Sequence, residues 1–142
     1  MNTIHHKSQP LVAHFISNRM ASNILLITLI LLAGFHVVIL LGFVPIENVW
    51  GGQIESRATL IIAEIAALLI VSLFMLIVAV RANYIQVNGY ARLFGFGTWV
   101  MLAFFALNTV GNLAAETLLE KVIFTPVTLI LVICAWRLTI KE

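Results

Sequence analysis

The sequence alternates between long apolar runs and short polar segments. No Asp, Glu, Lys or Arg occurs between Arg19 and Glu47 or from 93 to 115, and Glu64 is the only charged residue from 58 to 80. A helix that crosses the hydrocarbon of a bilayer needs about 20 mostly apolar residues, and lipid offers the backbone no hydrogen bonds. These runs therefore predict membrane-spanning helices over about residues 20–44, 58–81 and 93–113.

A fourth apolar run, from Val122 to Trp136, carries no charge but contains Pro126. A helix that began at Pro126, capped by Thr125, would measure about 22 Å at 1.5 Å per residue, too short for a hydrocarbon core of about 30 Å. We therefore expect one helix over about residues 117–139, kinked at Pro126. The kink would leave the carbonyl of Val122 without its hydrogen bond within the helix. This carbonyl would then either bind a ligand group or accept a hydrogen bond from a neighbouring helix.

Together the four runs predict an all-α fold, a four-helix transmembrane bundle that forms a single membrane domain over residues 1–142. The composition agrees, because 62% of the residues are hydrophobic and only 10% are charged. A typical soluble domain has about 25% charged residues. From the length of the chain we expect one compact unit and no separate soluble catalytic domain.

The basic residues predict the orientation of the bundle. If the N-terminus is cytoplasmic, two basic residues, Arg57 and Lys121, lie on the opposite side of the membrane. Six others lie on the cytoplasmic side: Lys7, Arg19, Arg81, Arg92, Arg137 and Lys141. The positive-inside rule then places both termini in the cytoplasm. The predicted partner is the lipid bilayer, since a net charge of +2 spread over several loops is not the footprint of a nucleic-acid-binding protein.

The segment between the first two helices carries more polar and turn-forming residues than a linker needs. Pro45 ends the pattern of the first helix, because proline cannot donate the next hydrogen bond of a helix. Gly51 and Gly52 indicate a tight turn or a close approach of another backbone. Trp50 is either an anchor at the membrane interface or part of a site.

A second polar cluster precedes the fourth helix, on the same side of the membrane. Asn108 and Asn112 are one helical turn apart, and Glu116 and Glu120 repeat that spacing. Gly111 either ends the third helix, so that Asn112 caps it, or allows a close approach of another backbone. The two asparagines are thus capping residues or an amide pair that lines a pocket.

Two ionisable residues lie inside the predicted membrane region. Glu64 lies roughly 9 Å into the second helix and His36 roughly 12 Å before the end of the first, at similar depth in the outer half. A charged carboxylate that faces lipid costs at least ~2.5 kcal/mol. Glu64 should therefore face the bundle and find a partner, for which His36, Arg57 and Lys121 are the candidates. The pair would be either a structural hydrogen bond or part of a functional site.

We hypothesise that these groups line one outward-facing polar cavity. The candidate ligand-binding residues are His36, Trp50, Glu64, Asn108, Asn112, Glu116 and Glu120. Three functions stay open: binding or transport of a small molecule or cation, an enzyme that acts on a lipophilic substrate with Glu64 and His36 as acid and base, and an accessory subunit of a larger membrane complex. An oligomer of identical chains is also open, because small-residue spacings are common in all membrane helices.

No cofactor or metal is predicted. Cys134 is the single cysteine, which excludes a disulfide oxidoreductase that works with cysteine pairs. The motifs H-E-x-x-H and G-x-S-x-G are absent from the sequence, as is a phosphate-binding glycine loop. Whether the protein is an enzyme is left open by the sequence.

The stretches "VPIENVWGG", "NTVGNLAAETLLEKVIFTP" and "WRL" resemble an uncharacterised family of bacterial four-helix membrane proteins. Its members combine P-x4-WGG in an outer loop with N-T-x-G-N and E-K-x4-P. The resemblance covers about residues 11–138 and implies four helices in the cytoplasmic (inner) membrane of a bacterium, without implying an activity. It singles out Trp50, Gly51, Gly52, Asn108, Gly111, Asn112, Glu120, Lys121 and Pro126.

Overall fold

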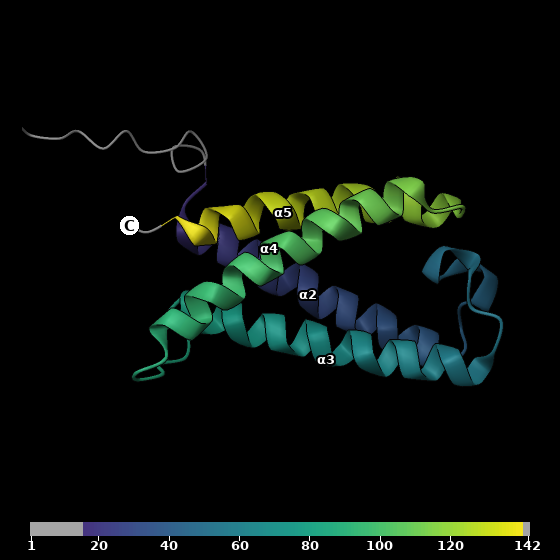
Figure 1. Cartoon of the computed structure of the whole chain (residues 1–142), viewed down its shortest axis with the longest axis horizontal. Coiled ribbons are helices and arrows are strands. Elements are labelled where there is room, and N and C mark those ends of the chain that lie inside the picture. The colour runs from purple at the N-terminus through teal and green to yellow at the C-terminus, as the bar shows by residue number, and fades with distance from the viewer. Residues whose placement is uncertain (1–15, 141–142) are drawn as a thin grey trace, which may run out of the picture.

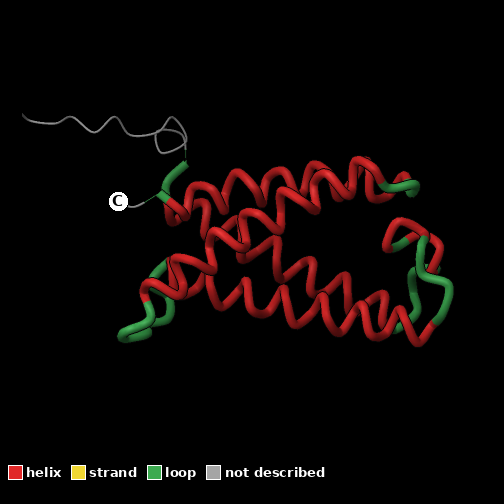
Figure 2. The backbone as a smooth tube through the Cα atoms, viewed as in Figure 1, coloured by secondary structure: helices red, strands yellow, loops and turns green. Residues whose placement is uncertain are grey.

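The computed structural model describes residues 16–140, which form four long helices and no strand (Figures 1 and 2). The helices are α2 (Asn18–Leu40), α3 (Arg57–Arg81), α4 (Ala91–Ala114) and α5 (Thr125–Thr139). A π-helical turn, η3 (Glu120–Phe124), leads directly into α5, so that the fourth span comprises Glu120–Thr139. With 23, 25, 24 and 20 residues, all four spans are long and apolar enough to cross a membrane. The predicted all-α, four-helix bundle is confirmed.

The two ends of the bundle differ in what they hold. At one end, which we call the terminal end, α2 begins and α5 finishes (Figure 1). There Nε of Arg137 donates to the carbonyl of Ile16 at 2.7 Å. At the other, the loop end, residues 41–56 join α2 to α3. Both described ends of the chain therefore lie on one side of the bundle. Lys7 and Lys141, used above to predict orientation, lie outside the described residues.

Local signals fix where α2 and α3 begin and end. The hydroxyl oxygens of Ser17 and Ser56 each accept a hydrogen bond of 3.1 Å from the backbone amide three residues further along the chain. They therefore cap the N-termini of the two helices. α2 ends at Leu40, earlier than the expected residue 44, because Gly42 adopts φ +85°, a conformation that glycine readily adopts. Pro45 therefore lies beyond the helix, where it precedes the 3₁₀ turn η1 (Ile46–Asn48).

α4 continues beyond Gly111, which rules out one of the two predictions made for this residue. The helix continues through Gly111 and Asn112 to Ala114, so the expectation that Gly111 ends it and Asn112 caps it is wrong. Gly111 does not adopt a positive φ, and a Cβ atom placed on it would meet nothing within 4 Å. The close approach occurs at Gly97 instead, where a Cβ atom would lie 2.9 Å from Cδ1 of Ile77 on α3.

The fourth helix begins before Pro126, as expected. In η3 the amide of Thr125 donates to the carbonyl of Glu120, five residues back. This wider turn allows the chain to pass into α5 at Pro126 without leaving the helix, because the missing N–H of proline falls at a place where the usual hydrogen-bond pattern has already changed. The irregular turn thus lies at the loop end of the bundle.

The four helices form two pairs, α2 with α3 and α4 with α5. The main core joins the pairs in the terminal half through residues such as Leu25, Phe74, Met101 and Leu131. Toward the loop end the pairs diverge, and the connection between α2 and α3 lies at their opening (Figure 1). A smaller cluster of Ile39, Val49 and Leu60 packs this connection against α2 and α3. The bundle is therefore closed by its core at one end and by a loop at the other.

Candidate functional site

A cavity of about 450 Å³ lies between the two helix pairs, on the loop side of the core. This volume falls within the ~300–1,000 Å³ that is usual for small-molecule sites. Its walls are largely apolar and aromatic, and include Leu32, Phe35, Ala63, Ile70, Phe104 and Phe124. Its polar lining comes from five of the candidate residues, His36, Trp50, Asn108, Asn112 and Glu120, together with Asn48 and Thr128.

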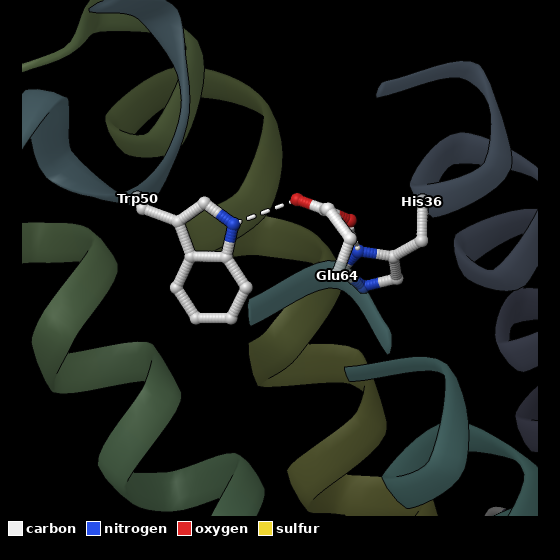
Figure 3. A network of polar contacts seen from close by, with 3 residues as sticks. All are labelled: His36, Trp50 and Glu64. Carbon is white, nitrogen blue, oxygen red and sulfur yellow. Dashed lines mark hydrogen bonds and ion pairs between the residues drawn. The ribbon is translucent and has the colours of Figure 1, made fainter. Parts of the chain in front are cut away.

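Glu64 connects two of these lining residues. Its Oε2 lies 2.6 Å from Nδ1 of His36, and its Oε1 accepts a hydrogen bond of 2.7 Å from Nε1 of Trp50 (Figure 3). The expected contact between His36 and Glu64 is therefore present. Within residues 16–140 neither Arg57 nor Lys121, the other two candidate partners, forms an ion pair with this carboxylate.

Burial separates the role of Glu64 from that of His36. Glu64 is completely buried and does not line the cavity, whereas the His36 side chain is 18% exposed and does. Both carboxylate oxygens of Glu64 are occupied, which removes the cost of burying unsatisfied acceptors. Glu64 thus fixes the positions of His36 and Trp50, and a ligand in the cavity would meet those two residues.

The turn at residues 50–52 has an unusual backbone that brings Trp50 to this place. Trp50, Gly51 and Gly52 have φ values of +54°, +68° and +73°. Glycine adopts this region freely, but a bulky side chain there is strained. The hydrogen bond from the indole to Glu64 is one interaction that holds Trp50 in that conformation. The segment "WGG" is therefore a turn that shapes the site.

Glu120 binds the same turn from the opposite helix pair. The amide of Gly51 donates to Glu120 Oε1 at 2.9 Å and to Oε2 at 3.0 Å. The hydroxyl of Thr117 also donates to Oε2, and its oxygen accepts from the amide of Glu120 at 3.4 Å. The loop is thus hydrogen-bonded to α3 through Trp50 and to the start of the fourth helix through Gly51. We call these two connections the loop latch.

The two asparagines are placed by the continuation of α4. Both line the cavity: Asn108 donates to the carbonyl of Phe104 at 2.9 Å, and Asn112 reaches Oγ1 of Thr128 at 3.5 Å. Glu116 is exposed and does not line the cavity. The four-residue spacing fails for Glu116 because α4 ends at Ala114, so that Glu116 no longer follows the helical face of the asparagines.

Three contributors were not foreseen from the sequence: Asn48, which lines the cavity, Thr128 and Thr117. Thr128 is buried at 7% exposure, and its hydroxyl donates to the carbonyl of Phe124 while it accepts from Asn112. Nothing in its local sequence distinguishes it from a threonine that bonds only to its own helix. Thr117 could have been found, because Thr117 and Glu120 match the capping-box pattern, threonine followed three residues later by glutamate.

The charges around the cavity are unbalanced. Among residues 16–140 no Lys or Arg lines it, and the only ion pair is the one between His36 and Glu64. Glu120 lines the cavity and has no basic side chain within 4.0 Å in the described chain. In the same part of the chain no group of three His, Cys, Asp or Glu residues is placed to hold a metal ion.

Comparison of the chain with protein-family models, with curated proteins and with solved structures found no match in any of the three. The function is therefore inferred from the geometry of the cavity and from the chemistry of the residues that line it.

Proposed function

We propose that this protein is a multi-pass protein of a bacterial inner membrane and binds a small, mainly apolar molecule in the cavity beneath the loop latch. The observation that carries the proposal is the cavity of about 450 Å³, with apolar walls and polar groups supplied by both helix pairs. With both termini cytoplasmic, as the basic residues predict, the loop end faces away from the cytoplasm. An accessory subunit that only packed against other chains would not need this cavity.

The distribution of lining residues supports a ligand with one polar end. Leu29, Phe74 and Leu131, which lie toward the core, give the deep part of the cavity an apolar wall. The loop end instead presents Trp50 and Glu120. An apolar ligand body would be buried against the deep wall, and its polar end would meet the hydrogen-bonding groups below the latch.

His36 supplies one group that is free to contact such a ligand. Its Nδ1 is engaged by Glu64, and no hydrogen bond from Nε2 occurs within residues 16–140. Because Glu64 fixes one ring nitrogen, the other has a defined position and acts as a donor or an acceptor according to the protonation of the ring.

The same contact supports a second candidate function, an enzyme that acts on a lipophilic substrate. A buried carboxylate that orients a histidine allows the second ring nitrogen to take or give a proton in general acid–base catalysis. In that case His36 would be the catalytic residue and Glu64 a positioning residue, because Glu64 does not line the cavity. This differs from the initial hypothesis, in which Glu64 and His36 act together as the acid and the base.

Binding to the cavity can be tested with the neutral fluorescent probe N-phenyl-1-naphthylamine and protein reconstituted in lipid nanodiscs. Ala67 lines the cavity, so Ala67→Phe should fill it and abolish saturable binding. Leu69 is 68% exposed on the same helix, so Leu69→Phe is the matched control and should bind like the wild type. The proposal would be overturned if the probe bound saturably and equally to Ala67→Phe and to the wild type, or if it did not bind saturably to the wild type.

A further inference from the structure

We infer that the ligand is a lipophilic cation, such as a quaternary ammonium or a protonated amine with apolar substituents. This inference rests on the proposed binding function and adds the charge of the ligand. It is carried by the juxtaposition, in one cavity, of several aromatic rings and a carboxylate that has no basic partner among residues 16–140.

The carboxylate is that of Glu120. Its oxygens accept hydrogen bonds from the amide of Gly51 and the hydroxyl of Thr117, which are both neutral donors. Lys121, the next residue, is exposed and does not line the cavity. A partly buried carboxylate without a counter-ion is costly in an apolar surrounding, and a cation in the cavity would reduce that cost.

The other charged groups at the site do not oppose a cation. The His36–Glu64 pair is neutral when the imidazole carries two protons and has a charge of −1 when it carries one. Glu120 adds a formal charge of −1, and within residues 16–140 no Lys or Arg lines the cavity, so the formal charge of these residues is −1 or −2. An anionic ligand would meet repulsion in either case, and the low dielectric of the surroundings would strengthen it.

The aromatic rings suit a cation that forms no hydrogen bonds. Phe35 of α2 and Phe124 of η3 lie with ring centroids 5.2 Å apart, and so join the two helix pairs at the cavity. Phe124 follows Glu120 by four residues, which places this ring pair close to the carboxylate along the chain. Phe74, Phe104 and Phe105 form a second aromatic group on its wall. The faces of such rings attract cations, including quaternary ammonium groups.

The test uses tetraphenylphosphonium as the cation and N-phenyl-1-naphthylamine as the neutral probe, with the full chain in nanodiscs. Glu120→Gln keeps an oxygen that can accept from Gly51 but removes the charge. We expect it to weaken saturable tetraphenylphosphonium binding by at least about tenfold, and by more than it weakens binding of the neutral probe. Glu116→Gln makes the same charge change outside the cavity, so it should leave both affinities unchanged.

A measurement on the wild type makes the test independent of how the variants fold. Tetraphenylphosphonium should displace the neutral probe, whereas tetraphenylborate, an anion of closely similar size and shape, should not displace it at equal membrane-bound concentration. Equal displacement by the two ions, or cation binding that survives Glu120→Gln, would overturn the inference while leaving the binding function intact. Absence of saturable binding of the neutral probe would instead overturn the binding function, and this inference with it. Saturable binding of the neutral probe without binding of the cation would overturn this inference alone.

Discussion

Nε1 of Trp50 lies 2.7 Å from Oε1 of Glu64, so a loop residue is hydrogen-bonded to a fully buried carboxylate on α3. Glu64 accepts from the loop on one oxygen and contacts His36 of α2 with the other. One acid inside the predicted membrane region therefore holds together a loop and two helices. A buried group of this kind is costly to leave unpaired, so each of the three partners depends on the others.

Removing the carboxylate should destabilise the bundle more than neutralising it. Glu64→Leu leaves the nitrogens of His36 and Trp50 without their acceptor. An unsatisfied buried group costs about 1–3 kcal/mol, and Trp50, which is 42% exposed, should contribute less than a fully buried group. Glu64→Gln keeps an oxygen for Trp50 and gains an amide that can donate to His36, so it should lose less. The free energy of unfolding in mixed micelles, measured by SDS titration, checks the order. Equal stability of Glu64→Leu and wild type would show that this contact contributes nothing to the fold.

The indole N–H should control the stability of the loop. Trp50→Phe removes the donor to Glu64 and keeps an aromatic ring, so we expect faster amide hydrogen exchange across residues 45–56 without loss of the helices. Trp99, 57% exposed on α4, gives the matched control, because Trp99→Phe should leave exchange in that segment unchanged. Unchanged exchange in Trp50→Phe would mean that packing alone holds the loop.

Two glycines should respond in opposite ways to alanine. Gly51 has φ +68°, so Gly51→Ala should cost about 1–2 kcal/mol of stability. Gly111 is inside α4 with nothing within 4 Å of an added Cβ atom, so Gly111→Ala should be neutral or stabilise by up to about 1 kcal/mol. Thermal unfolding of both variants in the same detergent measures the difference. A destabilised Gly111→Ala would contradict the continuation of α4 through this position.

Orientation can be tested by cysteine labelling in a Cys134→Ala background. The segment containing Glu55 lies at the loop end, and the segment containing Asn88 lies at the terminal end, between α3 and α4. We expect a membrane-impermeant maleimide to label Glu55→Cys in spheroplasts and to label Asn88→Cys only after the membrane is opened. Labelling of position 88 in intact spheroplasts would reverse the proposed orientation.

Much of the architecture could be predicted from the sequence because hydrocarbon imposes a simple rule. A long run without charge must satisfy its backbone internally, so the four helices follow from the spacing of charged residues alone. The same rule identified Glu64 as a residue that needs a partner, since a carboxylate facing lipid is expensive. It also placed the start of the fourth helix before Pro126, because a helix that began at the proline would be too short.

Only the tertiary structure decided which groups meet. The period of a helix relates residues on that helix, as it does for Asn108 and Asn112, but it does not fix how one helix is rotated against another. The choice of His36 as the partner of Glu64 depends on that rotation. The bond from Gly51 to Glu120, across 69 residues, depends on a left-handed turn that brings the loop over the opening between the helix pairs. The sequence by itself determined that buried polar groups needed partners, whereas packing determined the partners, because rotation and loop path are set by contacts between distant segments.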